Sequence, residues 1–120
     1  MTDKKVIKAF ISQPMKNKTR EEILIEREKI KNAIKRDILP NENIEFINSV
    51  LDENDAKNKP LWCLGKSIQL LSEADVVIFM EGYEKARGCL VERLCAKKYG
   101  IKTYIVYYDR DGKLAGFEYY

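Results

Sequence analysis

Short apolar runs of β-strand composition alternate with segments of helical periodicity along this chain, and this alternation is what most restricts its fold. The strand-type runs are expected at 4–12, 44–50, 75–80 and 102–108. The helical segments are expected at 20–37, 60–74 and 87–99. Strands that alternate with helices in this way predict a parallel sheet with helices covering both of its faces.

Local signals mark where the helices begin and end. Thr19 followed by Glu22 has the spacing of a capping box, and Pro60 suits a first helical turn. Gly100 follows the third helix and fits a left-handed C-terminal cap. The isoleucines of the first helix fall near helical spacing, at Ile23, Ile30, Ile34 and Ile38.

The run "DVVIFM" at 75–80 is almost entirely apolar, as buried parallel strands are. The chain has 120 residues, 45% of them hydrophobic, and no linker rich in Pro or Gly, which predicts one domain over 1–120. We expect an α/β, flavodoxin-like three-layer sandwich. Its four parallel strands would lie in the order 2-1-3-4, and 114–120 would add a short antiparallel edge strand.

Composition excludes several classes of function. The net charge of +3 comes from Lys and Arg spread among acids, so no nucleic-acid-binding surface is expected. No apolar run reaches membrane-spanning length. Cys63, Cys89 and Cys95 lack CxxC spacing and the chain has no His, which argues against a disulfide framework and a zinc site and favours the reducing cytoplasm. No metal or cofactor is implied, and acid–base chemistry would fall to Asp, Glu, Tyr, Lys or Cys.

The ligand site of such a sheet lies beyond the carboxyl ends of its strands, where the strand order reverses. Two loops emerge there, 12–18 after the first strand and 81–88 after the third. For the order 2-1-3-4 these loops face each other. The polar stretch 52–59 belongs to the same edge and is expected to be a mobile loop that closes over ligand. Trp62 and the tyrosines at 104, 107 and 108 suit the core or a subunit interface.

Three segments carry a resemblance to a known family. They are "FISQPM" after the first strand, "ADVVIFMEGYEKARGCLVE" through the third, and "AKKYGIKTYIV" into the fourth. In this order they resemble the nucleoside 2-deoxyribosyltransferase-like superfamily, and most of all its small DUF4406-type branch of phages and bacteria. That branch pairs an "ISGPM"-like loop with a W/Y-E-K-S-x-G-A-x-x-E segment.

The resemblance implies that Glu92, four residues after Gly88, is the nucleophile that attacks the anomeric carbon of a sugar. A carboxylate beneath that carbon stabilises the positive charge that develops there or forms a glycosyl ester. The N-terminus of the helix would keep Glu92 ionised. The alternative is that Glu92 pairs with Arg87 or Arg93 on a solvated helix face.

The two loops supply the other candidate residues. The first loop would cradle the base, and the second would hold the sugar, with Tyr83 stacking, Glu84 binding a hydroxyl and Arg87 a phosphate. The alternatives are packing for Tyr83, an exposed charge for Glu84 and a salt bridge to Glu84 or Glu92 for Arg87. For the first loop they are capping of the loop by Ser12 and Gln13 and packing by Met15. The candidate substrate-binding residues are Ser12, Gln13, Met15, Gly82, Tyr83, Glu84, Arg87 and Gly88.

The expected function is hydrolysis of a nucleoside or nucleotide N-glycosidic bond, or transfer of its sugar to another base. The alternative is a protein that binds a nucleotide-derived small molecule without turning it over. Ala86 and Cys89 favour the alternative, because the superfamily often has Ser or Asp at the position of Ala86 and Thr at the position of Cys89. The resemblance also implies a homodimer or higher homo-oligomer.

Overall fold

The sheet has five strands in the order β2-β1-β3-β4-β5. In this computed structural model, which describes residues 5–50, 59–108 and 113–120, the first four strands pair in parallel. The fifth pairs antiparallel with β4. The strands are β1 (Val6–Ser12), β2 (Asn43–Phe46), β3 (Val76–Met80), β4 (Lys102–Tyr108) and β5 (Leu114–Tyr119). The predicted order of the parallel strands is confirmed, and the edge strand extends the sheet to five.

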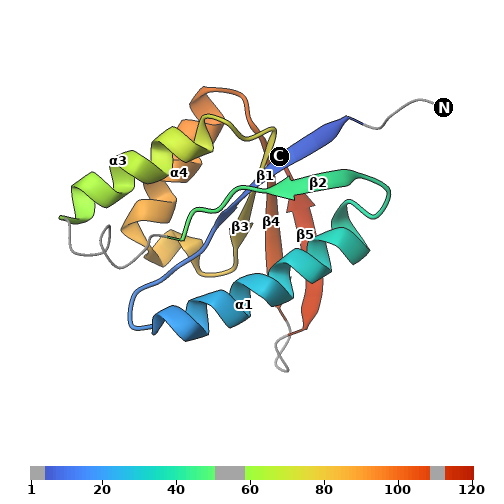
Figure 1. The fold of residues 1–120 in the computed structure, drawn as a ribbon, viewed down its shortest axis with the longest axis horizontal. Helices are drawn as coiled ribbons and strands as arrows, with labels where there is room; N and C mark the ends of the chain where they lie inside the picture. Colours follow the sequence, from blue (N-terminus) through green and yellow to red (C-terminus); the bar gives the residue numbers. More distant parts are fainter. Residues whose placement is uncertain (1–4, 51–58, 109–112) are drawn as a thin grey trace.

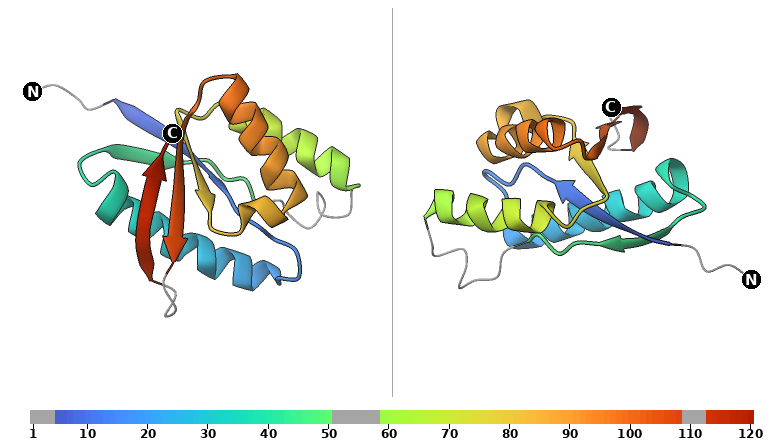
Figure 2. Two further views of the ribbon diagram at one scale, coloured as in Figure 1. Left: turned by 180° about the vertical axis from the view of Figure 1, so that it is seen from behind. Right: turned by 90° about the horizontal axis from the view of Figure 1, so that it is seen from above.

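The helices cover both faces of the sheet (Figures 1 and 2). They are α1 (Arg20–Ala33), the π-helical η1 (Ile34–Ile38), α3 (Pro60–Leu71), the 3-10 turn η2 (Tyr83–Lys85) and α4 (Arg87–Lys98). Ile30 and Ile34 pack on one face with Ala9 and Ile11, whereas Leu71 and Ala96 pack on the other with Phe10. Successive residues of β1 therefore point to opposite layers, as the pleat requires.

The helix signals in the sequence are confirmed. Thr19 Oγ1 accepts from the Glu22 N–H, and Glu22 Oε1 accepts from the Thr19 N–H, both at 3.1 Å. Pro60 is the first residue of α3. Gly100 has φ +70°, a left-handed conformation that a residue with a Cβ adopts at a cost.

Several element boundaries differ from the prediction. Strand β1 begins at Val6 and α3 ends at Leu71, and the first helix and β2 also end at other residues than expected. The first helix changes from α to π hydrogen bonding after Ala33 and continues to Ile38, where the Leu39 N–H reaches the Ile34 carbonyl. Strand β2 ends at Phe46, not at residue 50, and beyond it Ser49 accepts a hydrogen bond from Arg27. Residues 52–58 of the predicted lid, 52–59, lie outside the described residues.

Candidate functional site

Glu92 lies where three elements meet at the carboxyl edge of the sheet. Its Oε1 accepts a hydrogen bond of 2.7 Å from the hydroxyl of Ser12, the last residue of β1. Its Oε2 accepts one of 2.6 Å from the hydroxyl of Ser67 on α3. The side chain is only 5% exposed. The alternative of a solvated helix face is therefore wrong, and within the described chain the partners of Glu92 are hydroxyls, not Arg87 or Arg93.

Burial opposes the ionisation of Glu92. It raises the pKa of this carboxyl above its ordinary value, while the Ser67 and Ser12 hydroxyls and the charge of Arg27 act in the opposite direction. Glu92 lies in the second turn of α4, and the helix dipole acts mainly within the first. The helix N-terminus therefore adds little to the ionisation of Glu92.

Arg27 is a buried cation beneath the site, 4% exposed, that no motif had indicated. Its Nε donates to Gln13 Oε1 at 3.0 Å, its Nη1 to Ser49 Oγ at 2.7 Å and its Nη2 to the Ile11 carbonyl at 3.2 Å. Burial lowers the pKa of the guanidinium to about 10, and attraction by Glu92 opposes this shift. Arg27 thus ties α1 to the end of β1 and to the chain that follows β2.

Gln13 has a framework role in this structure. Its Nε2 donates to the Ile23 carbonyl at 3.0 Å and to Glu26 Oε1 at 2.8 Å, and its Oε1 accepts from Arg27. Both amide hydrogens and the carbonyl are therefore engaged by the protein. The geometry places Ser12 at Glu92 but leaves Gln13 no free N–H with which to recognise a base. Met15, half-buried, accepts at its carbonyl from the Lys18 N–H.

The loop between β3 and α4 contains the remaining candidates. Gly82 has φ +93°, which suits glycine and lets the chain turn into η2. Tyr83 packs its ring 5.3 Å from that of Phe79, which matches the packing alternative. Glu84 and Arg87 are exposed. These two side chains lie at the surface, apart from the buried carboxylate of Glu92.

Gly88 lies at the start of α4, beside α3. A Cβ added to it would meet Leu64 Cδ1 at 3.8 Å, an ordinary contact, and its φ is not positive. Neither backbone conformation nor helix packing therefore requires glycine here. The next residue, Cys89, is buried, and burial raises the pKa of its thiol to about 11, which makes it a poor nucleophile.

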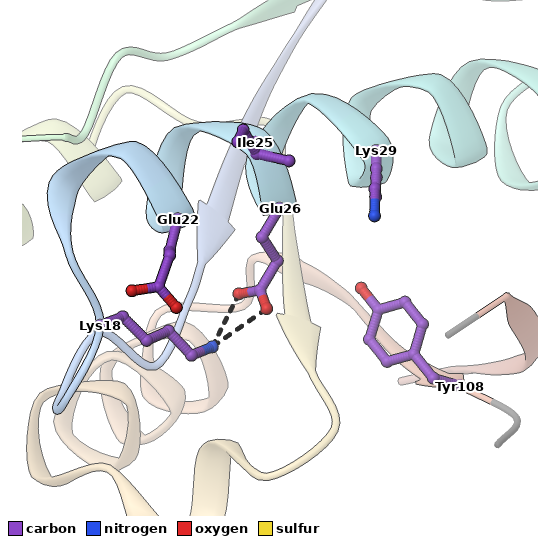
Figure 3. Close-up of a pocket in the computed structure, with 6 residues that line it drawn as sticks. All are labelled: Lys18, Glu22, Ile25, Glu26, Lys29 and Tyr108. Carbon is purple, nitrogen blue, oxygen red and sulfur yellow. Dashed lines mark hydrogen bonds and ion pairs between the residues drawn. The ribbon is translucent and has the colours of Figure 1, made fainter. Parts of the chain in front are cut away.

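A surface hollow of about 460 Å³ lies between α1 and the end of β4 (Figure 3). Its lining residues are Lys18, Glu22, Ile25, Glu26, Lys29 and Tyr108. Lys18 and Glu26, which both line it, form an ion pair of 2.9 Å, and the buried Tyr108 hydroxyl has no hydrogen-bond partner among the described residues. Glu26 also accepts from Gln13, so a single side chain separates this hollow from the interior network, but Glu92 does not line it.

In the part of the chain that the structure describes, no group of three or more Cys, Asp or Glu side chains is arranged to hold a metal ion. The same ranges contain no helix with the length and apolar character needed to cross a bilayer.

Sequence reasoning missed Ser67 and Arg27. For Arg27 a signal existed, because it lies four residues after Ile23 and three before Ile30, on the apolar stripe of the helix. A charged residue on a core-facing stripe needs buried partners. For Ser67 the sequence carries no comparable signal, since serine is common on partly exposed helix faces.

Comparison with known proteins supports the fold alone. No protein-family model and no curated protein matches the chain. Its structure is similar to a crystal structure of a conserved protein from Enterococcus faecalis V583, with a TM-score of 0.61 and 13% sequence identity. The similarity covers 88% of this chain and 66% of the other, so this chain spans just under two thirds of that protein.

Proposed function

We propose that this protein cleaves the N-glycosidic bond of a nucleoside or nucleotide, by hydrolysis or by transfer of the sugar to another base. The observation that carries this proposal is Glu92, a buried carboxylate held by Ser12 and Ser67 at the carboxyl edge of β1 and β3. This edge is where ligands bind in α/β sheets whose strand order reverses between neighbouring strands. The strand order and the helices on both faces favour a flavodoxin-like fold for the domain.

The two serine hydroxyls orient Glu92 but occupy only part of its capacity to accept hydrogen bonds. A carboxylate has about four acceptor positions, and Ser12 and Ser67 occupy one on each oxygen. Among the described residues no other hydrogen bond to Glu92 forms, and in this proposal the remaining lone pairs serve the anomeric carbon of a sugar. Fixing the nucleophile in one orientation before substrate arrives lowers the entropic cost of the reaction.

In the proposed step, a Glu92 oxygen forms a bond to the anomeric carbon while the bond from that carbon to the base nitrogen breaks. The base leaves with the electron pair and takes up a proton from solvent, and the water or base that attacks in the second step returns a proton to solvent. Water, or the nitrogen of a second base, then attacks the glycosyl ester and releases the Glu92 carboxylate. Gly88, where nothing in the fold requires glycine, leaves room for the sugar beside the helix.

A second candidate function is binding without turnover. It is favoured by the burial of Glu92, which raises the pKa of the group that the reaction needs ionised. A protonated Glu92 would donate a hydrogen bond to a bound sugar instead of attacking it.

Mass spectrometry of free base, after incubation with a panel of nucleosides and nucleoside monophosphates, tests the proposal. Release of base from a member of the panel is expected. Saturable binding without release supports the second candidate. If no member of the panel is bound or releases its base, both candidate functions are refuted.

A further inference from the structure

The two edges of the sheet are protected to very different degrees. At one edge, β2 has four residues, and the ammonium groups of Lys31 and Lys35 lie 5.6 and 5.5 Å from the centre of the Phe46 ring. At the other, β5 has six residues and contains neither Lys nor Pro. Phe117 and Tyr119 on β5 are 43% and 57% exposed. Short strands, lysines and prolines are among the means of keeping an edge from pairing, and β5 has none of these three. It does carry Glu118, and its ladder with β4 has an irregularity at Tyr107 and Tyr108, so the regular part of the edge is 116–119.

Strand β5 is held firmly on the sheet. Thr103 and Tyr120 exchange two main-chain hydrogen bonds, of 3.1 and 2.7 Å. The Arg93 guanidinium of α4 lies 5.2 Å from the centre of the Tyr120 ring. Figures 1 and 2 show β5 beside β4 at the outer edge of the sheet. A partner would therefore meet a preformed strand and would lose little entropy in ordering it.

The hydrogen bonds to β4 determine which groups of β5 face outward. In an antiparallel pair, residues alternate between those that bond across the ladder and those that point away from it. Because Tyr120 bonds to Thr103, the register assigns Glu118 and Gly116 to the bonded set as well. The N–H and C=O groups of Phe117 and Tyr119 therefore point to the open edge.

We propose that two copies of this chain pair through β5, antiparallel about a twofold axis, with Phe117 of one copy opposite Phe117 of the other. This register aligns the outward-facing main-chain groups, so the two phenylalanines exchange both of their hydrogen bonds. It joins the two sheets into one continuous sheet. The inference concerns an assembly surface and does not depend on the proposed function.

Charge selects this register over its neighbour. Moving the twofold axis to Glu118 also aligns outward-facing groups, but it places the two Glu118 carboxylates directly opposite each other, which destabilises a strand pair. With Phe117 on the axis, Glu118 lies opposite Gly116 of the second copy. The glycine has no side chain to clash with the carboxylate.

The side chains favour the same arrangement. Phe117 and Tyr119 lie on one face with Tyr104, at ring-centre distances of 6.0 and 5.1 Å from it. The twofold axis brings this aromatic cluster against its equivalent in the second copy and buries the exposed rings. Aromatic pairs across strands add to the stability of such a ladder.

Sedimentation equilibrium tests the inference on the full chain. We expect the wild type to be a dimer and Phe117→Lys to be a monomer of unchanged circular dichroism, with a dissociation constant raised at least 100-fold. Leu24→Lys is the matched control, because Leu24 is 44% exposed but lies on α1, and it should remain a dimer. A monomeric wild type, or a dimer that persists in folded Phe117→Lys, overturns the proposal.

Disulfide formation tests the register and remains informative if the lysine variant does not fold. Phe117→Cys should cross-link the two copies at residue 117 under mild oxidation, as peptide mapping would show against the wild type, which has its own free cysteines. Glu118→Cys should not cross-link at residue 118. Absence of the 117 cross-link, or a stronger one at 118, contradicts the arrangement.

Discussion

Removing the Ser67 hydroxyl should raise the pKa of Glu92. In Ser67→Ala, Glu92 loses the hydrogen bond of 2.6 Å that favours its charged form, while burial, which favours the neutral form, is unchanged. A hydrogen bond to a charged group contributes about 1.5–3 kcal/mol, and the neutral carboxyl loses only part of this. A differential loss of about 1.4 kcal/mol corresponds to about one pKa unit.

The assay is a pH titration of the Glu92 carboxyl carbon by 13C NMR, with the signal assigned by its loss in Glu92→Gln. Ser72→Ala is the matched control. It removes a hydroxyl from the end of the same helix, where Ser72 donates to the Gln69 carbonyl and does not contact Glu92. We expect the Glu92 pKa to rise in Ser67→Ala and to stay at the wild-type value in Ser72→Ala. An unchanged pKa in Ser67→Ala would show that the Ser67 hydroxyl does not favour the charged form of Glu92.

Three further predictions follow from the same geometry. Arg27→Met leaves buried acceptors on Gln13 and Ile11 without their donor. It should therefore lower the free energy of unfolding, measured in urea, by about 3–5 kcal/mol. A loss below about 1 kcal/mol would show that the network contributes little. Gly88→Ala should fold with wild-type stability, since the added methyl group meets only Leu64. It should nevertheless lower substrate turnover by about 10- to 100-fold. Unimpaired turnover would exclude an approach of the substrate over Gly88. Because the Glu92 pKa is raised in the folded state, protonation of Glu92 favours folding. This contribution to the free energy of unfolding is fully present below the ordinary pKa of 4.5 and is lost as the pH rises through the folded-state pKa. Chemical denaturation should therefore show wild type losing stability relative to Glu92→Gln over that interval, and parallel pH profiles would be inconsistent with this.

Local signals in the sequence predict most of the fold. The capping box of Thr19 and Glu22, the first-turn Pro60 and the left-handed Gly100 each act within one turn, so the residues that cause the structure are adjacent in the sequence. The π-helical turn at Ile34–Ile38 was not predicted. Its isoleucines satisfy the same core-facing spacing in either helix type, so the pattern does not distinguish them.

The candidate site is predictable only in part, because its contacts join residues far apart in the sequence. The loop motifs indicate Ser12 and Glu92, which lie 80 positions apart and are in hydrogen-bond contact. They do not show that Ser67 is the second donor, which depends on how α3 lies against α4. They also assign Gln13 to a ligand, whereas the buried Arg27 draws its carbonyl inward.

The rate of base release by Glu92→Gln shows most directly whether Glu92 attacks the anomeric carbon. Glutamine keeps the size of the side chain and an acceptor for Ser12 or Ser67, but it removes the nucleophile. On a nucleoside or nucleotide that the wild type cleaves, the substitution should lower release of free base by about a thousandfold or more and change ligand affinity by only about a few-fold, since the lost interaction belongs to the transition state. Equal rates of base release by the wild type and a folded Glu92→Gln would contradict the account.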